Sequence, residues 1–291
     1  MNKTKTLIIG ANGMLGGSLI RCLSKDPTLE VVGTIRGSAA SKSLGNQGVY
    51  NLIEGIDVAD FSSVKKVLKD FGPAYVLNCV GIIKQLKDSK SPVLSIEINS
   101  LLPHKLADAC NDVGARLIHF STDCVFSGSK GAYSEKDTPD ATDLYGRSKL
   151  LGEVDYGPHL TLRTSIIGHE LDKAVSLVDW FLQNEGPVNG YVNAVFSGMP
   201  TVYVSEFLRA HVFGSELRGL YHLSVEPINK HKLLCLIKDE YGLSTEISPY
   251  ADFCIDRSLS SGKLRAATGF VYPTWENLIR KMREEYLEYF V

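Results

Sequence analysis

The feature that most constrains the fold is a strand, a glycine turn and a helix at the start of the chain. Thr6–Ile9 is a short β-rich run, Gly10, Gly13 and Gly16 follow it at regular spacing, and a helical pattern covers residues 14–24. In such a unit the first glycine permits a tight turn, the second lets backbone N–H groups approach a pyrophosphate, and the third lets the helix pack on the strand. The context predicts a dinucleotide-binding site.

Further strands alternate with helices as far as about residue 165, which predicts an α/β fold built on a doubly wound parallel sheet of the Rossmann type. Beyond that point the pattern weakens and indicates a smaller α+β substrate-binding domain. We expect a dinucleotide-binding domain at 1–165, with 200–224 returning to it, and a substrate-binding domain at 166–199 and 225–291. The finer expectations are a helix from Ile98 to Ala109, a turn at 186–190 and a loop after Tyr241.

Composition narrows the class of protein. The formal net charge of −2 argues against a nucleic-acid-binding surface, and no apolar run approaches the ~18 residues that a membrane-spanning helix needs. The six cysteines are scattered and form no C-x-x-C pair, which indicates reduced thiols. No signal-peptide h-region precedes the first strand, so we expect a cytoplasmic protein without nucleic-acid or membrane partners. The histidines show no metal-ligand spacing, and no metal is expected.

The end of the second strand, Val31–Arg36, bears on the choice of cofactor. Folds that select NAD usually place an Asp or Glu there to bind the ribose hydroxyls. This chain has Arg36 instead, and a guanidinium suits the 2′-phosphate of NADP. The sequence therefore predicts NADPH and leaves NADH open as an alternative.

A second stretch carries the chemistry. Tyr145 and Lys149 lie four residues apart on a helical segment, so their side chains share one face. An ammonium beside a phenol lowers the pKa of the phenol, and the phenol can then give a proton to an oxygen that gains negative charge. Thr122 follows the apolar strand 117–120, at the carboxyl end where such sheets bind ligands. Together these residues predict hydride transfer between a nicotinamide and a carbonyl carbon.

These motifs resemble the extended short-chain dehydrogenase/reductases, and among them the dTDP-4-dehydrorhamnose reductase family. The resemblance rests on Ser-Thr-Asp-x-Val-Phe at 121–126, on Tyr-Gly-Arg-Ser-Lys at 145–149 with Glu153, and on Asp-x-Ser…Lys-Leu…Gly-Phe…Pro-x-Trp over 256–275. It is sharp to about residue 165 and loose between 166 and 255. The resemblance implies NADPH-dependent reduction of the 4-keto group of a nucleotide-linked 6-deoxy sugar, for synthesis of cell-surface polysaccharide.

The resemblance also assigns roles to residues. Tyr145 is expected to be the general acid, Lys149 to bind the nicotinamide ribose, and Thr122 to orient the ketone; these are the expected catalytic residues. Thr122, Asp123 and Cys124 are the expected substrate contacts. The expected cofactor contacts are Gly10, Asn12, Gly13, Met14, Leu15, Arg36, Asp57, Val58, Cys79, Val80, Gly81, Asn99, Tyr145 and Lys149.

Cys124 leaves an alternative open. The family usually has an aromatic residue there, whereas GDP-fucose synthase has a Cys that works with a His to move protons beside the ketone before reduction. The nearest candidate here, His169, falls earlier in its segment than expected, so we favour a packing role for Cys124 over an epimerase–reductase. A non-catalytic NADP-binding subunit, like the regulatory subunit of methionine adenosyltransferase, is a further alternative. The expected partner is the nucleotide sugar, and a homodimer is left open.

Overall fold

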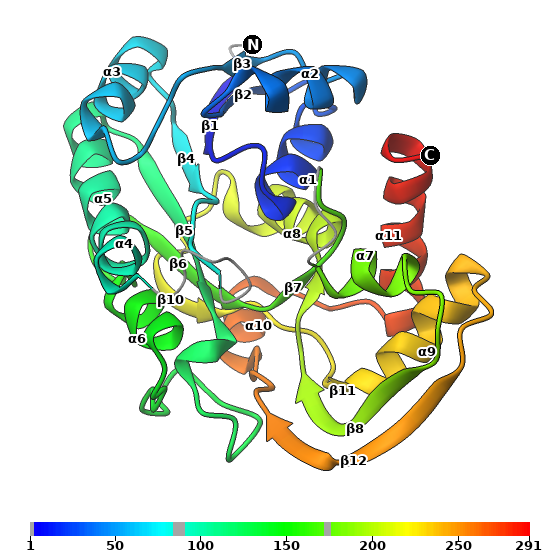
Figure 1. Ribbon diagram of the computed structural model, residues 1–291. Coiled ribbons are helices and arrows are strands. Elements are labelled where there is room, and N and C mark those ends of the chain that lie inside the picture. The colour runs from blue at the N-terminus through cyan, green and yellow to red at the C-terminus, as the bar shows by residue number, and fades with distance from the viewer. Residues whose placement is uncertain (1–2, 84–90, 172–175) are drawn as a thin grey trace.

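The computed structural model describes residues 3–83, 91–171 and 176–291, and a seven-stranded sheet forms its centre (Figure 1). Its strands are β1 (Thr4–Ile9), β2 (Leu29–Thr34), β3 (Leu52–Ile53), β4 (Tyr75–Asn78), β5 (Arg116–Thr122), β6 (Leu160–Thr164) and β10 (Gly219–His222). They lie in the order β10-β6-β5-β4-β1-β2-β3, and every neighbouring pair is parallel. The predicted doubly wound parallel sheet is confirmed.

Helices cover both faces of this sheet (Figure 1). They are α1 (Met14–Leu23), α2 (Ser38–Asn46), α3 (Phe61–Phe71), α4 (Pro92–Ser95), the π-helix η2 (Ile96–Leu101), α5 (Leu102–Val113), the short η3 (Asp123–Val125), α6 (Leu144–Leu151), α8 (Thr201–Phe207) and η4 (Leu208–Val212). On β1, Leu7 and Ile9 pack with residues of α3 and α5, whereas Ile8 packs with residues of α1 and α8. Strands buried on both faces have continuous apolar runs, which is why the sequence marks them clearly.

The glycine turn after β1 has the predicted geometry. Gly10 adopts a φ of +85°, a left-handed conformation that favours glycine. A Cβ at Gly16 would clash with the carbonyl oxygen of Gly10, so only a glycine lets α1 approach the turn. At Gly13 the nearest atom to an added Cβ is that same oxygen, at 3.7 Å. At Gly16, α1 therefore packs tightly against the turn, whereas an added Cβ at Gly13 would make only an ordinary van der Waals contact.

The winding of the chain reverses at β1. From β1 the chain proceeds through β2 to β3 at one edge of the sheet, and β4 then pairs with the other side of β1. At such a switch point the loops after two neighbouring strands diverge, and ligands of open α/β sheets bind in the resulting crevice. The fold thus places the glycine turn and the segment after β4 on opposite sides of one crevice.

A smaller α+β part lies beside the carboxyl ends of these strands (Figure 1). Its elements are β7 (Ile166–Ile167), α7 (Leu177–Leu182), β8 (Val188–Phe196), β9 (Met199–Pro200), β11 (Ile228–Asn229), α9 (Lys230–Tyr241), β12 (Ile247–Asp256), α10 (Gly262–Thr268) and α11 (Trp275–Tyr289). β8 is the middle strand of a sheet ordered β11-β8-β12, and β7 pairs with β9. Residues of this part, among them Ile166, Ile167 and Lys230, line the same crevice.

Two expectations for the smaller part are wrong. The segment 186–190 is not a turn, because β8 begins at Val188 and Gly190 lies within it. An added Cβ at Gly190 would stand 2.7 Å from the His231 ring, so this glycine allows α9 to pack closely on β8. The loop expected after Tyr241 contains the ten-residue strand β12, none of whose residues is buried. Without a buried face, β12 shows no hydrophobic alternation that could reveal it.

The helix expected from Ile98 to Ala109 is longer than predicted. α4, η2 and α5 follow one another directly from Pro92 to Val113. The Ser91 side chain accepts a hydrogen bond from the Leu94 N–H at 3.4 Å, and Pro92 stands in the first turn. Both are ordinary signals of a helix start, so this boundary was readable in the sequence.

Across the described ranges, no helix combines the length and the apolar character that spanning a membrane requires.

Candidate functional site

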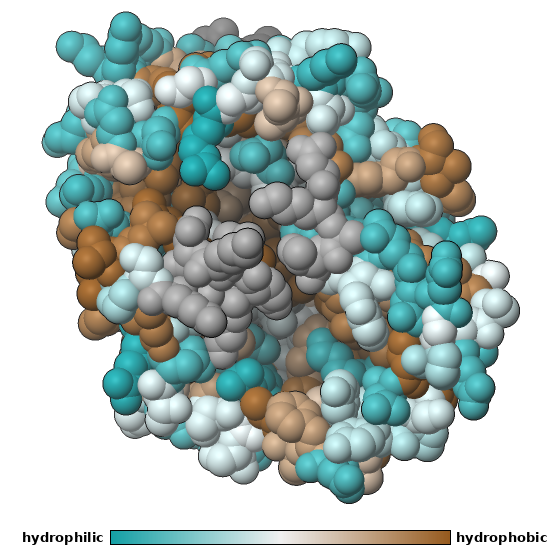
Figure 2. All heavy atoms as spheres, in the orientation of Figure 1, coloured by the Kyte–Doolittle hydropathy of each residue, from teal (hydrophilic) through white to brown (hydrophobic). Residues whose placement is uncertain are grey.

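A cleft of about 590 Å³ opens at the carboxyl ends of β1, β4 and β5. Figure 2 shows the face of the molecule on which this cleft opens, with hydrophilic side chains along much of its outer margin. The cleft is lined by Asn12–Leu15, Asn78–Ile83, Phe120–Cys124, Tyr145, Lys149, Thr164–Ile167, Glu170, Leu171, Ser176, Leu177 and Lys230. The structure thus brings the glycine turn, the segment after β4 and all three expected catalytic residues to one space.

The glycine turn is suited to a pyrophosphate. Gly13 is the N-cap of α1, and no side chain caps this helix end, so N–H groups of the first turn are free of capping partners. Together with the positive end of the helix dipole, such groups attract a phosphate. Asn12, Gly13, Met14 and Leu15 all line the cleft, at the level of this helix end.

Five expected cofactor contacts do not line the cleft. Arg36 and Asp57 are exposed, Val58 is partly buried, and Gly10 lies under the turn. Arg36 follows β2 and directly precedes Gly37, the N-cap of α2. An exposed guanidinium at this position is accessible to a phosphate at the adenosine end of a dinucleotide. These four roles stay predictions.

The fifth residue, Asn99, forms hydrogen bonds with the backbone of Ile82, which lines the cleft. Its Oδ1 accepts a hydrogen bond from the Ile82 N–H at 2.8 Å, and its Nδ2 donates to the Ile82 carbonyl at 3.1 Å. The same Nδ2 donates to Ser148 Oγ at 3.2 Å. Asn99 therefore holds the cleft-lining residue Ile82 and links it to α6, which carries Tyr145 and Lys149.

Helix α6 is fixed tightly against the end of β5. Asp143 caps the helix by accepting a hydrogen bond from the Gly146 N–H at 2.9 Å. A Cβ at Gly146 would clash with the Cys124 carbonyl, so the glycine allows this close approach. Thr122 Oγ1 donates to Asp123 Oδ1 at 3.1 Å and accepts from the Cys124 N–H at 3.1 Å. The Thr122 hydroxyl is thus held in place beside the start of α6.

The pKa of Tyr145 differs from the sequence-based expectation. Burial raises this pKa, the nearby Cys124 raises it further, and a hydrogen bond with the Thr122 side chain lowers it only in part. Lys149 instead donates from Nζ to the Phe120 carbonyl at 2.7 Å. The expected lowering by Lys149 is therefore not seen, because the ammonium is directed at the backbone of β5 and burial dominates.

Lys149 itself is strongly perturbed. Burial lowers the pKa of its ammonium to about 8, although the nearby Glu153 and Cys79 favour the charged form. A buried ammonium gains from every additional oxygen acceptor that it meets. Lys149 is accordingly suited to bind hydroxyl groups of a ligand in the cleft.

A buried ion pair supports this end of β5 from below. Arg163 donates from Nε and Nη2 to the two carboxylate oxygens of Glu153, at 2.8 and 2.7 Å. Ser121 Oγ also donates to Glu153, at 2.6 Å. Both charged side chains are less than a tenth exposed, at 4% for Arg163 and 7% for Glu153. The network joins β5, β6 and the end of α6 directly beneath Thr122.

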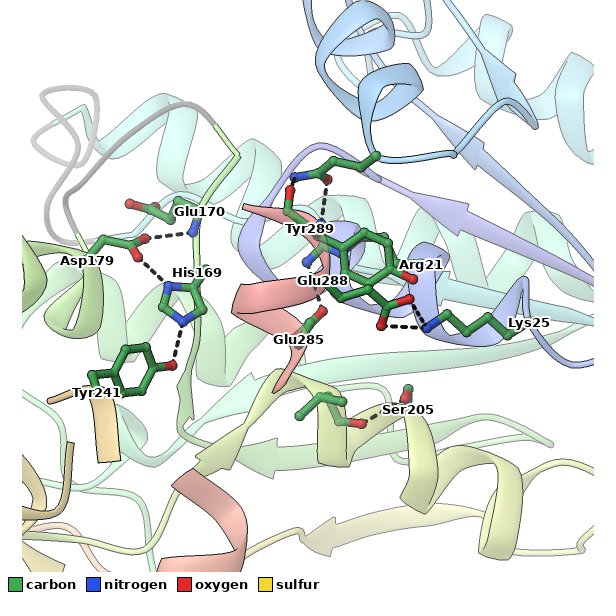
Figure 3. A network of polar contacts seen from close by, with 12 residues as sticks. Arg21, Lys25, His169, Glu170, Asp179, Ser205, Tyr241, Glu285, Glu288 and Tyr289 are labelled. Carbon is green, nitrogen blue, oxygen red and sulfur yellow. Dashed lines mark hydrogen bonds and ion pairs between the residues drawn. The ribbon is translucent and has the colours of Figure 1, made fainter. Parts of the chain in front are cut away.

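His169 lies in a separate network. Its Nδ1 contacts Asp179 Oδ1 at 2.6 Å, and its Nε2 contacts the Tyr241 hydroxyl at 2.8 Å (Figure 3). The ring also packs against Tyr286 of α11. Both ring nitrogens therefore have partners away from Cys124, and no histidine of the described chain lines the cleft.

Sequence reasoning missed Lys230, which reaches the cleft from the smaller part. It is the first residue of α9, where the helix dipole disfavours a cation. A cation at the start of a helix is an unusual feature, but it does not show which cleft the side chain reaches. Within the described ranges, no group of three His, Cys, Asp or Glu side chains could hold a metal ion.

Comparisons with known proteins identify the family and the fold. A family model described as the RmlD substrate binding domain matches residues 4–288. Among solved structures, the dTDP-4-dehydrorhamnose reductase of Bacillus anthracis, in complex with NADP, has a TM-score of 0.80 at 21% identity. That likeness covers 97% of this chain and 99% of the other chain, and it shows a shared fold.

Three curated relatives also match. The chain is 32% identical to the probable low-salt glycan biosynthesis reductase of Haloferax volcanii over 165 residues, and 32% identical to the dTDP-4-dehydrorhamnose reductase of Streptomyces griseus over 152 residues. These alignments cover 55% and 52% of this chain but only 52% and 44% of the relatives, about half their length. The beta subunit of methionine adenosyltransferase 2 of Xenopus tropicalis is 25% identical over 272 residues, covering 85% of this chain and 75% of that protein.

Proposed function

The chain belongs to the RmlD substrate binding domain family, and on that premise we propose that it reduces the 4-keto group of a nucleotide-linked 6-deoxy sugar with NADPH. One observation carries the proposal. The glycine turn, the segment after β4 and the set of Thr122, Tyr145 and Lys149 line a single cleft at the switch point of the sheet. The reductases among its relatives support a role in glycan synthesis.

In this proposal the cofactor supplies the hydride, and the side chains supply position and a proton. The turn after β1 holds the pyrophosphate by backbone N–H groups, and Lys149 holds the nicotinamide ribose. The Thr122 hydroxyl turns its single proton from Asp123 Oδ1 to the ketone oxygen when the sugar binds, and Tyr145 gives its proton to the same oxygen. The raised pKa of Tyr145 keeps the phenol protonated until that oxygen gains negative charge.

The division of the chain follows the same proposal. Residues 1–165 with 200–224 form the dinucleotide-binding domain, and 166–199 with 225–291 form the substrate-binding domain. The seven-stranded sheet, which includes β10, and the separate sheet around β8 support this division. None of the six cysteines, all of which lie in the described ranges, forms a disulfide, and this supports a cytoplasmic location.

The direct test is a screen of enzymatically made 4-keto-6-deoxy sugar nucleotides. The sugars are linked to dTDP, UDP, GDP or CDP, and NADPH absorbance is followed. We expect oxidation of NADPH with at least one of them. Absence of oxidation with all four would contradict the proposal.

Arg36 provides a test of cofactor choice. Arg36→Ala is expected to weaken NADPH binding by about 1.5–3 kcal/mol, the range for a hydrogen bond to a charged group, because the 2′-phosphate loses its guanidinium. NADH lacks that phosphate, so its affinity should hardly change and serves as the internal control. Fluorescence titration with both cofactors measures the two affinities. Equal losses for NADPH and NADH would show that Arg36 does not read the phosphate.

Cys124 decides between a simple reductase and an epimerase–reductase. Because both nitrogens of His169 have other partners, we favour the simple reductase. Cys124→Ala should then change kcat little and lower the free energy of unfolding by about 1 kcal/mol, the effect of a small cavity. The wild-type reaction in D₂O with unlabelled NADPH should leave C3 and C5 of the product free of deuterium. Enzyme-dependent deuterium at either carbon would establish the epimerase–reductase.

A regulatory subunit is the second candidate. The sequence alignment with the beta subunit of methionine adenosyltransferase 2 covers 85% of this chain, whereas the alignments with the two curated reductases cover 55% and 52%. For such a subunit we expect NADPH to bind tightly and to survive incubation with all four sugar nucleotides. Turnover with any of them favours the enzyme.

A further inference from the structure

We propose that Lys230 is a substrate contact which, together with Asp123, recognises the hydroxyl group on the carbon next to the ketone. The inference rests on the proposed function and extends it to the choice of sugar. Lys230 belongs to the smaller part of the molecule, whereas Asp123 directly follows the Thr122 end of β5. Both side chains line the same cleft.

Lys230 occupies a position that is unfavourable for a cation. It is the first residue of α9, whose first turn contains no acidic side chain. The positive end of the helix dipole and burial both disfavour the ammonium there; burial lowers the pKa of Lys230 to about 8, although the nearby Asp123 and Cys124 favour the charged form. A residue that opposes its local environment in this way is typical of functional sites.

The ammonium of Lys230 has N–H donors that no described residue accepts. Its contact within the described chain is the ring of Phe196, whose centroid lies 3.5 Å from Nζ. Among the described residues it has no hydrogen-bond acceptor, yet an ammonium carries three N–H donors. Lining the cleft, these donors face the space that the substrate fills.

Asp123 supplies the complementary acceptor. Its side chain is buried, and Oδ1 accepts a hydrogen bond from Thr122 Oγ1 at 3.1 Å. A hydroxyl group is both donor and acceptor, so it can donate to Asp123 while it accepts from Lys230. A phosphate offers only acceptors, and Asp123 would repel it. The pair of Lys230 and Asp123 therefore fits a sugar hydroxyl better than the pyrophosphate of the nucleotide.

The chemistry of the proposed substrate identifies the hydroxyl that Lys230 and Asp123 recognise. Thr122 orients the ketone in the proposed function, and Asp123 is its neighbour in the chain, so the pair acts beside the reacting carbon. In a 4-keto-6-deoxy sugar the carbons next to C4 are C3, which carries a hydroxyl, and C5, which carries the methyl group and the ring oxygen. The hydroxyl recognised by Lys230 and Asp123 is therefore the one on C3.

The first test measures binding by calorimetry with Lys230→Met, which keeps the length of the side chain and removes its charge. The probes are the 4-keto-6-deoxy sugar nucleotide that the wild type binds most tightly and the matching nucleoside diphosphate without sugar. We expect the variant to bind the sugar nucleotide about 10- to 100-fold more weakly, the effect of a lost charged hydrogen bond. Binding of the nucleoside diphosphate and of NADPH should be unchanged.

Lys232→Met is the matched control, because Lys232 is an exposed lysine in the same first turn of α9. It should leave the binding of both probes unchanged. Equal losses of sugar nucleotide and nucleoside diphosphate in Lys230→Met would assign Lys230 to the pyrophosphate and overturn the proposal. A wild type that binds no sugar nucleotide would overturn the proposed function as well, so the two failures are distinguishable.

The second test measures specificity. The ratio of kcat/KM for the 3-hydroxy substrate to kcat/KM for its 3-deoxy analogue should be large in the wild type, because buried polar groups reject a ligand that leaves them unpaired. In Lys230→Met this ratio should fall about 10- to 100-fold, and Lys230→Arg should retain part of it. A structural role for Lys230 would lower both rates together, and an unchanged ratio would overturn the proposal.

Discussion

Replacing Tyr145 with Phe is expected to lower kcat for sugar reduction by about 10²–10⁴-fold, the loss typical of a missing general acid. The substitution removes only the phenolic oxygen, so the fit of the ring against the end of β5 is preserved. Thr122 would still hold the ketone oxygen, and NADPH should bind as in the wild type. Stopped-flow absorbance of NADPH measures the rate, and fluorescence titration measures cofactor binding.

Tyr156→Phe is a chemically matched control for this experiment. Tyr156 is 45% exposed, and its hydroxyl contacts His104 Nδ1 at 2.8 Å, away from the residues that line the cleft. This variant should retain the wild-type kcat. If Tyr145→Phe also kept a near-normal kcat, the proton would have to come from another group.

The second large effect is expected from the ion pair beneath the cleft. Glu153→Ala should lower the free energy of unfolding by about 3–5 kcal/mol, because it leaves a buried guanidinium without its carboxylate. The Arg163 side chain is 4% exposed, and it donates two hydrogen bonds to the Glu153 carboxylate, at 2.8 and 2.7 Å. Urea titration followed by circular dichroism measures the loss.

The surface pair of Lys25 and Glu288 provides the control for Glu153. The two side chains point toward one another in Figure 3. They are 53% and 52% exposed, so solvent screens the attraction. Glu288→Ala should change the free energy of unfolding by less than about 1 kcal/mol. If Glu153→Ala were as mild as Glu288→Ala, the buried pair would contribute little to the support of β5.

The sequence predicts those parts of the fold that depend on neighbours along the chain. The turn at Gly10, Gly13 and Gly16 is specified by residues within one strand–helix unit, and the strands of the large sheet are apolar on both faces. Helices α9 and α11 begin directly after Asn229 and Thr274, whose side chains cap them. Local capping and periodicity are sufficient for such elements.

Features that depend on distant contacts escaped prediction. β12 is stabilised by pairing with β8, some sixty residues away in the chain, and has no buried face of its own. The expectation that Lys149 lowers the pKa of Tyr145 did not include the burial of the phenol by the surrounding strands. That burial raises the pKa. Lys230 joins the cleft through the packing of α9, which no motif near Thr122 reveals. Each of these three concerns a tertiary contact, whereas the start of α4 was missed although Ser91 and Pro92 mark it locally.

The place of β10 has a consequence for how such a protein can evolve. The chain leaves the large sheet after β6, forms β7 to β9, returns as the edge strand β10, and leaves again for β11 and β12. A smaller part threaded in this way cannot be exchanged by a single recombination event. Replacement of all residues after 165 would also remove β10 and expose the edge of β6. An exposed edge strand promotes aggregation. If the smaller part binds the sugar as proposed, new sugar specificities arise by substitutions within the threaded segments, and not by replacement of a whole module.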